Sequence, residues 1–134
     1  FYQGIKKNMF RLIKLLIALG CLISDISIAH HSFTAEFTAE RTIVLQGQVE
    51  EVWFRNPHVR YILKVQNSEG VTENWDLRGS PVVWLARKGW TKDSIKVGDI
   101  ITAEGYPGHS NRKMLSIIRV TLPDGSILID RAPE

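Results

Sequence analysis

Cysteine is almost absent from this chain of 134 residues, in which Cys21 is the only one. A single thiol cannot form a disulfide within the chain, and it cannot build a cysteine cluster around a metal. The fold must therefore depend on a hydrophobic core. A chain of this length has room for one such core, so we expect a single folded domain.

Sequence motifs of common hydrolases are absent as well. The chain contains no Gly-x-Ser-x-Gly element and no paired histidines at helical spacing. Ser80 precedes Pro81, which fits a helix N-cap better than a nucleophile. Glu50 and Glu51 are adjacent, so on a regular strand they face opposite ways and cannot act as a carboxylate pair. We therefore predict a binding protein rather than an enzyme.

A strong charge of one sign is missing from most of the chain. The formal net charge is +3, but the excess lies before residue 30, where Asp25 is outnumbered by Lys6, Lys7, Arg11 and Lys14. From residue 30 onward, basic and acidic residues are equal in number. Because binding to nucleic acid depends on many contacts from Lys and Arg to phosphates, this balance argues against a nucleic-acid partner.

No apolar run is long enough for a stable membrane span, which needs about 20 residues. The longest run, residues 15–23, follows basic residues and precedes Ser27-Ile28-Ala29, a cleavage site of the small-x-small type. This is the order of a secretion signal. We predict an upstream remnant at residues 1–8, a signal at 9–29 cleaved after Ala29, and a periplasmic or secreted mature protein without a membrane span. Lipid attachment at Cys21 is an alternative.

Alternating apolar residues predict three consecutive strands. The first strand begins near residue 43, and its alternation changes parity at Glu50-Glu51, as an extra residue in a β-bulge would cause. Asn56-Pro57 ends this strand. Residues 59–66 alternate again, and turn residues at 67–70 lead into a third strand at 71–77. The three strands should form a meander.

A short helix and further strands follow. Ser80 as N-cap, Pro81 at the first helical position and Gly89 after the last turn predict a helix at residues 82–88, with Trp84 or Leu85 facing the core. Further strands are expected at 101–105, 114–122 and 127–129. This order matches the OB-fold. We predict an all-β fold with an N-terminal segment (30–41) and a five- to six-stranded OB-fold-like antiparallel barrel (42–130), with another small sandwich as the alternative.

Several short motifs, in a fixed order, resemble a family of small exported bacterial proteins of uncharacterised function. The resemblance implies export and one small domain, and it carries no assigned activity. The motifs are His30-His31-Ser32-Phe33, Gly47-x-Val49, Asn56-Pro57-His58, Trp75, Gly79-Ser80-Pro81, Gly89-Trp90 and Thr121-Leu122-Pro123-Asp124-Gly125.

Cleavage after Ala29 would place a free α-amine and an imidazole on His30, beside a second imidazole on His31. Nitrogen donors of this kind favour Cu(II), so the mature terminus is a candidate copper site. Further ligands would have to come from His58 or His109. The alternative is that these histidines are solvated or bonded to backbone and bind no metal.

Aromatic and cationic residues also gather where an OB barrel would bind a ligand. Together they could stack on and neutralise a polar molecule. The candidate residues are Trp53, Arg55, Asn56, Tyr61 and Trp75. The alternative is that Trp53, Trp75, Trp84 and Trp90 supply the bulk of a small core.

Two functions are therefore expected. The first is a periplasmic binding module that holds copper or another transition metal at its terminus. The second is a metal-free barrel that binds a small polar ligand, an oligosaccharide or a protein partner.

Overall fold

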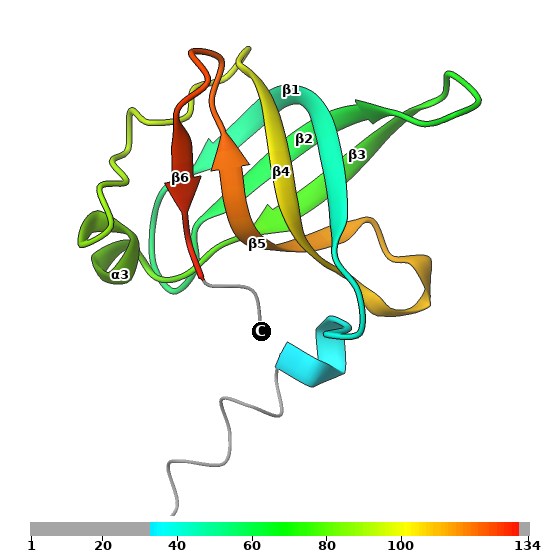
Figure 1. Cartoon of the computed structure of the whole chain (residues 1–134), viewed down its shortest axis with the longest axis horizontal. Helices are drawn as coiled ribbons and strands as arrows, with labels where there is room; N and C mark the ends of the chain where they lie inside the picture. The colour runs from blue at the N-terminus through cyan, green and yellow to red at the C-terminus, as the bar shows by residue number, and fades with distance from the viewer. Residues whose placement is uncertain (1–32, 132–134) are drawn as a thin grey trace, which may run out of the picture. The chain divides into compact units, whose positions relative to one another are not determined.

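The computed structural model describes residues 33–131, and the predicted signal, its cleavage site, His30 and His31 lie outside this range. A helical turn at residues 33–36 comes first. The elements that follow are β1 (Ile43–Trp53), β2 (Arg60–Gln66), β3 (Thr72–Arg78), α3 (Val82–Ala86), β4 (Ile100–Pro107), the 3-10 turn η1 (His109–Asn111), β5 (Met114–Thr121) and β6 (Ile127–Ile129) (Figure 1).

Five of these strands close into a barrel. Their hydrogen-bonded order is β3-β2-β1-β4-β5, and β3 also pairs with β5, which closes the ring; β6 is added beyond β5. The β3–β5 pairing is parallel and all the others are antiparallel. The predicted all-β barrel with one short helix between the third and fourth strands is confirmed, with one parallel seam that local sequence patterns do not reveal.

Strand β1 serves two neighbours because it is bent. Its first half, from Ile43 to Gln48, pairs with β4, and its second half, from Gln48 to Trp53, pairs with β2. The register shifts between Val49 and Glu51, so the predicted bulge is confirmed. The bulge lets one long strand turn from one wall of the barrel to the next.

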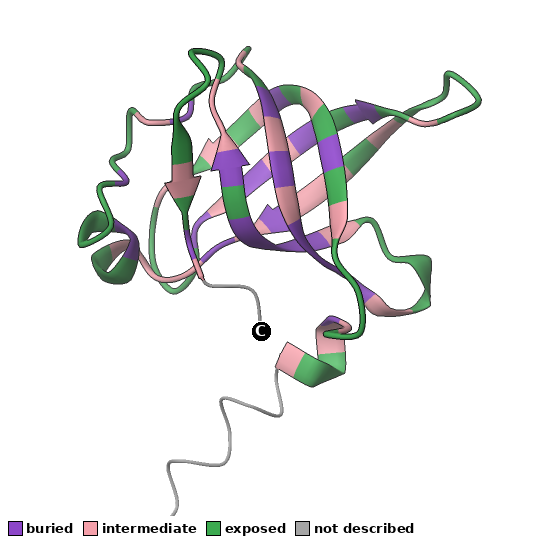
Figure 2. Ribbon diagram, in the orientation of Figure 1, coloured by how far each residue is buried: buried purple, intermediate pink, exposed green. Residues whose placement is uncertain are grey.

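The core lies inside the barrel, where the inward-facing residues of the strands meet (Figure 2). In β2 the residues Tyr61, Leu63 and Val65 are buried, as their alternation predicts. Of the four tryptophans, Trp90 is the only buried one, while Trp53 and Trp84 are 39% and 61% exposed. The interpretation of all four tryptophans as core residues is therefore wrong.

The helix α3 is shorter than predicted and begins differently. It ends at Ala86, and its N-cap is Pro81, without a capping hydrogen bond from a side chain. Ser80 is not the cap, because its Oγ donates a hydrogen bond to the buried Asp130. Leu85 is the helix residue that enters the core.

Candidate ligand-binding groove

The loop between β1 and β2 forms one wall of a surface groove of about 640 Å³. The end of β1, the start of β2 and the end of β3 complete it. We call it the arginine groove, and it is lined by Trp53, Arg55, Asn56, Pro57, His58, Arg60 and Arg78. Three residues that the sequence marked as ligand contacts, Trp53, Arg55 and Asn56, are thus brought together in one place.

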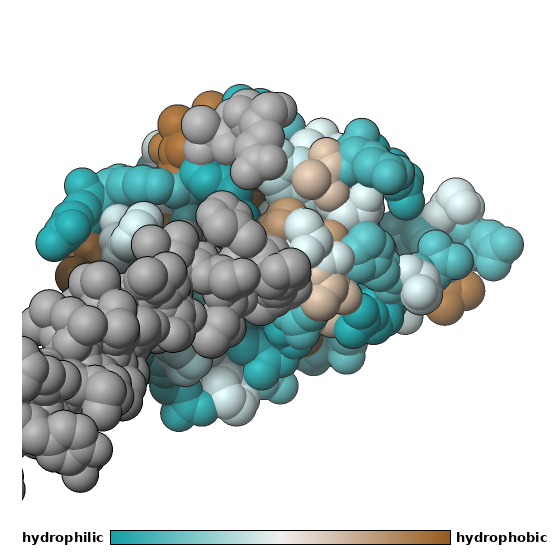
Figure 3. Space-filling model, turned by 90° about the horizontal axis from the view of Figure 1, so that it is seen from below, coloured by the Kyte–Doolittle hydropathy of each residue, from teal (hydrophilic) through white to brown (hydrophobic). Residues whose placement is uncertain are grey.

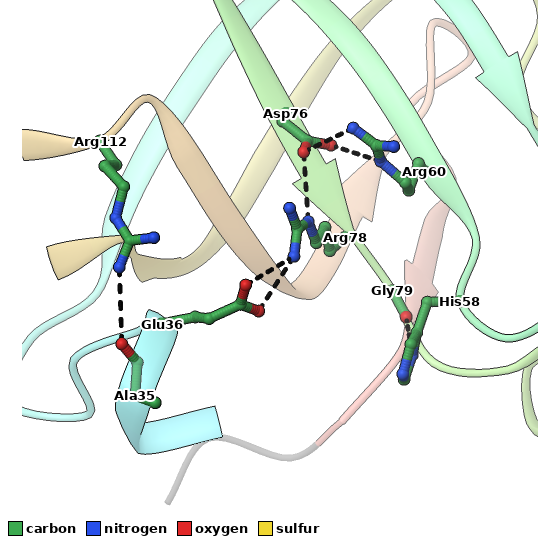
Figure 4. A network of polar contacts seen from close by, with 8 residues as sticks. All are labelled: Ala35, Glu36, His58, Arg60, Asp76, Arg78, Gly79 and Arg112. Carbon is green, nitrogen blue, oxygen red and sulfur yellow. Dashed lines mark hydrogen bonds and ion pairs between the residues drawn. The ribbon is translucent and has the colours of Figure 1, made fainter. Parts of the chain in front are cut away.

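A shared carboxylate lets two arginines stand opposite each other on this wall. Arg60 and Arg78 are direct partners across β2 and β3, where like charges repel. Asp76 relieves this repulsion: it accepts bonds from Arg60 Nε at 3.0 Å and Nη2 at 2.8 Å, and from Arg78 Nε at 3.1 Å (Figure 4). The hydrogen bonds to Asp76 raise the pKa of Arg60 above its usual value.

Arg78 has a second anionic partner from a distant part of the chain. Its Nη1 donates to both carboxylate oxygens of Glu36, at 3.1 and 2.9 Å (Figure 4). Glu36 belongs to the segment that precedes the barrel. Arg78 is therefore held between a barrel carboxylate, Asp76, and a carboxylate of the N-terminal segment.

Arg55 is arranged differently from the other two arginines. Its guanidinium carbon lies 4.2 Å from the centroid of the Trp53 ring, and that of Arg60 lies 5.6 Å from the same ring. Trp53 is itself oriented by a hydrogen bond from its Nε1 to Glu51 Oε2 at 3.0 Å. Among the described residues, no carboxylate forms an ion pair with Arg55. Stacking thus positions a guanidinium whose donors stay available.

Two polar residues of the loop anchor it to the rest of the barrel. Asn56 Oδ1 accepts a hydrogen bond from the backbone nitrogen of Val82 at 3.1 Å. His58 Nδ1 lies 3.1 Å from the carbonyl oxygen of Gly79, so this nitrogen carries the hydrogen and Nε2 remains available (Figure 4). These contacts make the groove wall part of the folded scaffold.

A family model described as a family of unknown function (DUF6152) matches residues 18–116, well over half of the chain. The chain belongs to this family. No curated protein and no solved structure matches it significantly. The DUF6152 match includes every residue that lines the arginine groove, and β6 lies beyond its end.

Trp75, also predicted as a ligand contact, lies in a different cleft of this DUF6152 protein. That cleft, of about 750 Å³, opens where the first half of β1 separates from the end of β2. Trp75 Nε1 donates to Glu73 Oε2 at 3.3 Å, and Lys113 Nζ lies 5.2 Å from the ring centroid. Trp75 and the arginine groove therefore do not form one binding face.

Tyr61, the remaining predicted contact, faces the core and is 1% exposed. Its hydroxyl oxygen has no hydrogen-bond partner among the described residues. Desolvation by burial, with a smaller contribution from the charge of Asp130, raises the pKa of Tyr61 well above its usual value. The outward side chains of β2, such as Arg60, are the ones that can meet a ligand.

The unpaired hydroxyl of Tyr61 leads to a prediction about stability. Tyr61→Phe should leave the free energy of unfolding unchanged or raise it by up to about 1 kcal/mol, because it removes a buried polar group without a partner. Tyr61→Ala should lower it by about 3–5 kcal/mol, because it also removes the ring. Urea unfolding at neutral pH measures both.

Comparison of the wild-type protein with Tyr61→Phe also isolates the effect of the hydroxyl on stability at high pH. An unfolded tyrosine ionises near pH 10 while the folded one stays neutral, so its contribution to stability is full below pH ~10 and falls above it. The wild-type protein should therefore lose more stability than Tyr61→Phe between pH 8 and pH 11. Equal losses would contradict the raised pKa.

The predicted metal ligands fall partly outside the described residues, since His30 and His31 do so. Within residues 33–131, no group of three or more His, Cys, Asp or Glu side chains is placed to hold a metal. His109 Nε2 donates to the carbonyl oxygen of Thr34 at 2.8 Å, and His58 belongs to the arginine groove. Copper binding at the mature terminus stays a prediction.

The helices and one face of the described surface were compared with what a membrane-spanning segment requires. No helix within residues 33–131 is long and apolar enough to cross a membrane. On the face seen in Figure 3, the described surface is mostly hydrophilic, and its apolar side chains lie in small separate groups.

The predicted ligand contacts did not include Pro57, Arg60 or Arg78, and His58 was expected only as a metal ligand. Arg78 reaches the groove because the β2–β3 register sets it opposite Arg60. The turn at residues 67–70 could have predicted this position, because it sets which residue of β3 lies opposite each residue of β2.

Proposed function

We propose that this protein is an exported, periplasmic or secreted binding module of OB type that holds a small polar ligand in the arginine groove. The observation that carries the proposal is the stacked pair of Trp53 and Arg55, in which a positioned guanidinium keeps its hydrogen-bond donors available. Export is supported by the secretion-signal pattern of residues 9–29.

The position of the groove within the barrel supports this proposal. OB barrels use the face of their second and third strands, together with the loop between the first and second, for ligands. Arg60 and Arg78 lie on those strands, and Arg55 lies in that loop. A guanidinium offers a planar fork of donors that suits a carboxylate or another polar group with two oxygens.

The side chains of the groove are also held in place before a ligand binds, unlike those of a freely solvated charged patch. Arg60 is held by two bonds to Asp76. Asn56 ties the loop to the start of α3, and His58 ties it to Gly79, directly after β3. Groups that are already in place lose little conformational freedom on binding, so a small ligand can gain affinity from few contacts.

Binding can be tested by tryptophan fluorescence, because Trp53 lines the groove. The full chain is titrated with acetate, glutarate, citrate, inorganic phosphate and maltose as separate probes. At least one probe should change the emission of the wild-type protein. Arg55→Ala should weaken that response at least about tenfold, because it removes hydrogen bonds to a charged donor.

Trp84 and Arg87 provide matched controls outside the groove. Trp84 is exposed on α3, and Arg87 follows it at the end of the helix. Trp84→Phe and Arg87→Ala should leave the affinity unchanged, whereas Trp53→Phe should abolish the signal change. A response that survives in both Trp53→Phe and Arg55→Ala would remove the groove as the binding site, as would a panel without any response.

A further inference from the structure

The barrel supplies the arginine groove with more positive charge than it neutralises by contact. Arg55, Arg60 and Arg78 all line the groove, and among the described barrel residues Asp76 alone forms ion pairs with them. Glu51 acts on Arg60 only through its longer-range charge, and its carboxylate accepts the bond from Trp53. Contact with Asp76 therefore leaves the groove with a net positive charge.

Glu36 adds a second carboxylate to the groove arginines from outside the barrel. Both of its carboxylate oxygens accept from Arg78 Nη1 (Figure 4). The contact is only partly shielded from water, because the Arg78 and Glu36 side chains are 32% and 41% exposed. Ion pairs at such exposure contribute little to stability, so another anion can replace this one at low cost.

The N-terminal segment is fastened independently of the Glu36 carboxylate. Phe37 is buried and forms a bridge to Gly108, and the backbone nitrogen of Thr38 donates to Pro107 at 3.0 Å. His109 binds the carbonyl oxygen of Thr34. Because none of these contacts uses the Glu36 carboxylate, it can leave Arg78 while the segment stays docked.

We infer that the arginine groove is a carboxylate-binding site, and that Glu36 fills its anion position on Arg78 until a ligand carboxylate displaces it. The inference rests on the proposed function, which concerns the same groove. Glu36 is a tethered competitor: it is always near Arg78, so it lowers the apparent affinity for any carboxylate that needs the same donors.

The test compares Glu36→Gln with Glu40→Gln in the full chain. Both changes remove one negative charge from the region before β1, but Glu40 forms no ion pair within the described residues. The probe is glutarate, with its neutral diamide, glutaramide, as the matched ligand control. Binding is followed by the Nε–H signals of Arg55 and Arg78 in nitrogen-15 NMR spectra.

Glu36→Gln should bind glutarate about two- to fivefold more tightly than the wild-type protein, which corresponds to the strength of an exposed ion pair. Glu40→Gln should bind glutarate with the affinity of the wild-type protein. Glutaramide should not bind to the wild-type protein or to either variant. Equal glutarate affinities for Glu36→Gln and Glu40→Gln would overturn the competitor role. Binding of glutaramide as tight as that of glutarate would overturn the carboxylate class.

These failures can be distinguished from failure of the proposed function. A neutral probe such as maltose, bound in a manner that depends on Trp53 and Arg55, would keep the binding module and overturn this inference. Glutarate binding that persists unchanged in Arg55→Ala and moves no groove signal would overturn both.

Discussion

Gly47→Ala is expected to lower the free energy of unfolding by about 3 kcal/mol, because the added carbon has no room between two strands. A Cβ at this position would lie 2.1 Å from the backbone oxygen of Lys64 and 3.1 Å from Leu63 Cγ. The nearest atom belongs to the backbone, so a change of rotamer cannot relieve the clash. Strands β1 and β2 would have to separate where β1 leaves β2 for β4.

Urea denaturation measures this loss, and Gln46→Ala is the control. Gln46 is an exposed neighbour on the same strand, so its truncation should change stability by no more than about 0.5 kcal/mol. If Gly47→Ala stayed within about 1 kcal/mol of the wild-type protein, close contact between β1 and β2 would not be a requirement of the fold.

Asp130→Ala is expected to have an effect of similar size, about 3 kcal/mol, because it removes a buried carboxylate and leaves two partly buried donors of Ser80 without their partner. Asp130 is completely buried, and its carboxylate accepts from Ser80 N at 2.8 Å and from Ser80 Oγ at 2.5 Å. Lys88 Nζ donates to the backbone oxygen of Asp130. Asp130 thus ties the residues after β6 to the start of α3.

Thermal and urea unfolding of three variants test this role. Asp130→Asn keeps one acceptor and should lose less stability than Asp130→Ala. Asp93→Ala removes a carboxylate from an exposed loop and should change stability by no more than about 0.5 kcal/mol. Additive losses for Asp130→Ala and Ser80→Ala in the double variant would contradict direct coupling between the two residues.

The same short segment that carries Ser80 also supports the arginine groove. Gly79 accepts the bond from His58, and Val82 donates to Asn56. Loss of the Asp130 contact should therefore disturb the groove as well as the fold. A ligand-binding loop gains precision when the elements beneath it are locked by buried hydrogen bonds.

The strands were predictable because each depends on its own residues. Alternation of apolar side chains located β2 and showed which of its residues face inward, and the parity change at Glu50-Glu51 located the bulge. The tryptophans were less predictable. In a helix of five residues, Trp84 and Leu85 are adjacent, and no period is long enough to indicate which one enters the core.

The sequence by itself determined the order of the elements, the bulge in β1 and the local cluster of Trp53, Arg55 and Asn56, because these depend on neighbours along the chain. Only the tertiary structure decided that Arg78 joins this cluster, that Glu36 binds Arg78 across 42 residues of sequence separation, and that Trp75 does not belong to the groove. Strand register and barrel closure set those distances. Both arise from hydrogen bonds between segments that the chain order does not place side by side.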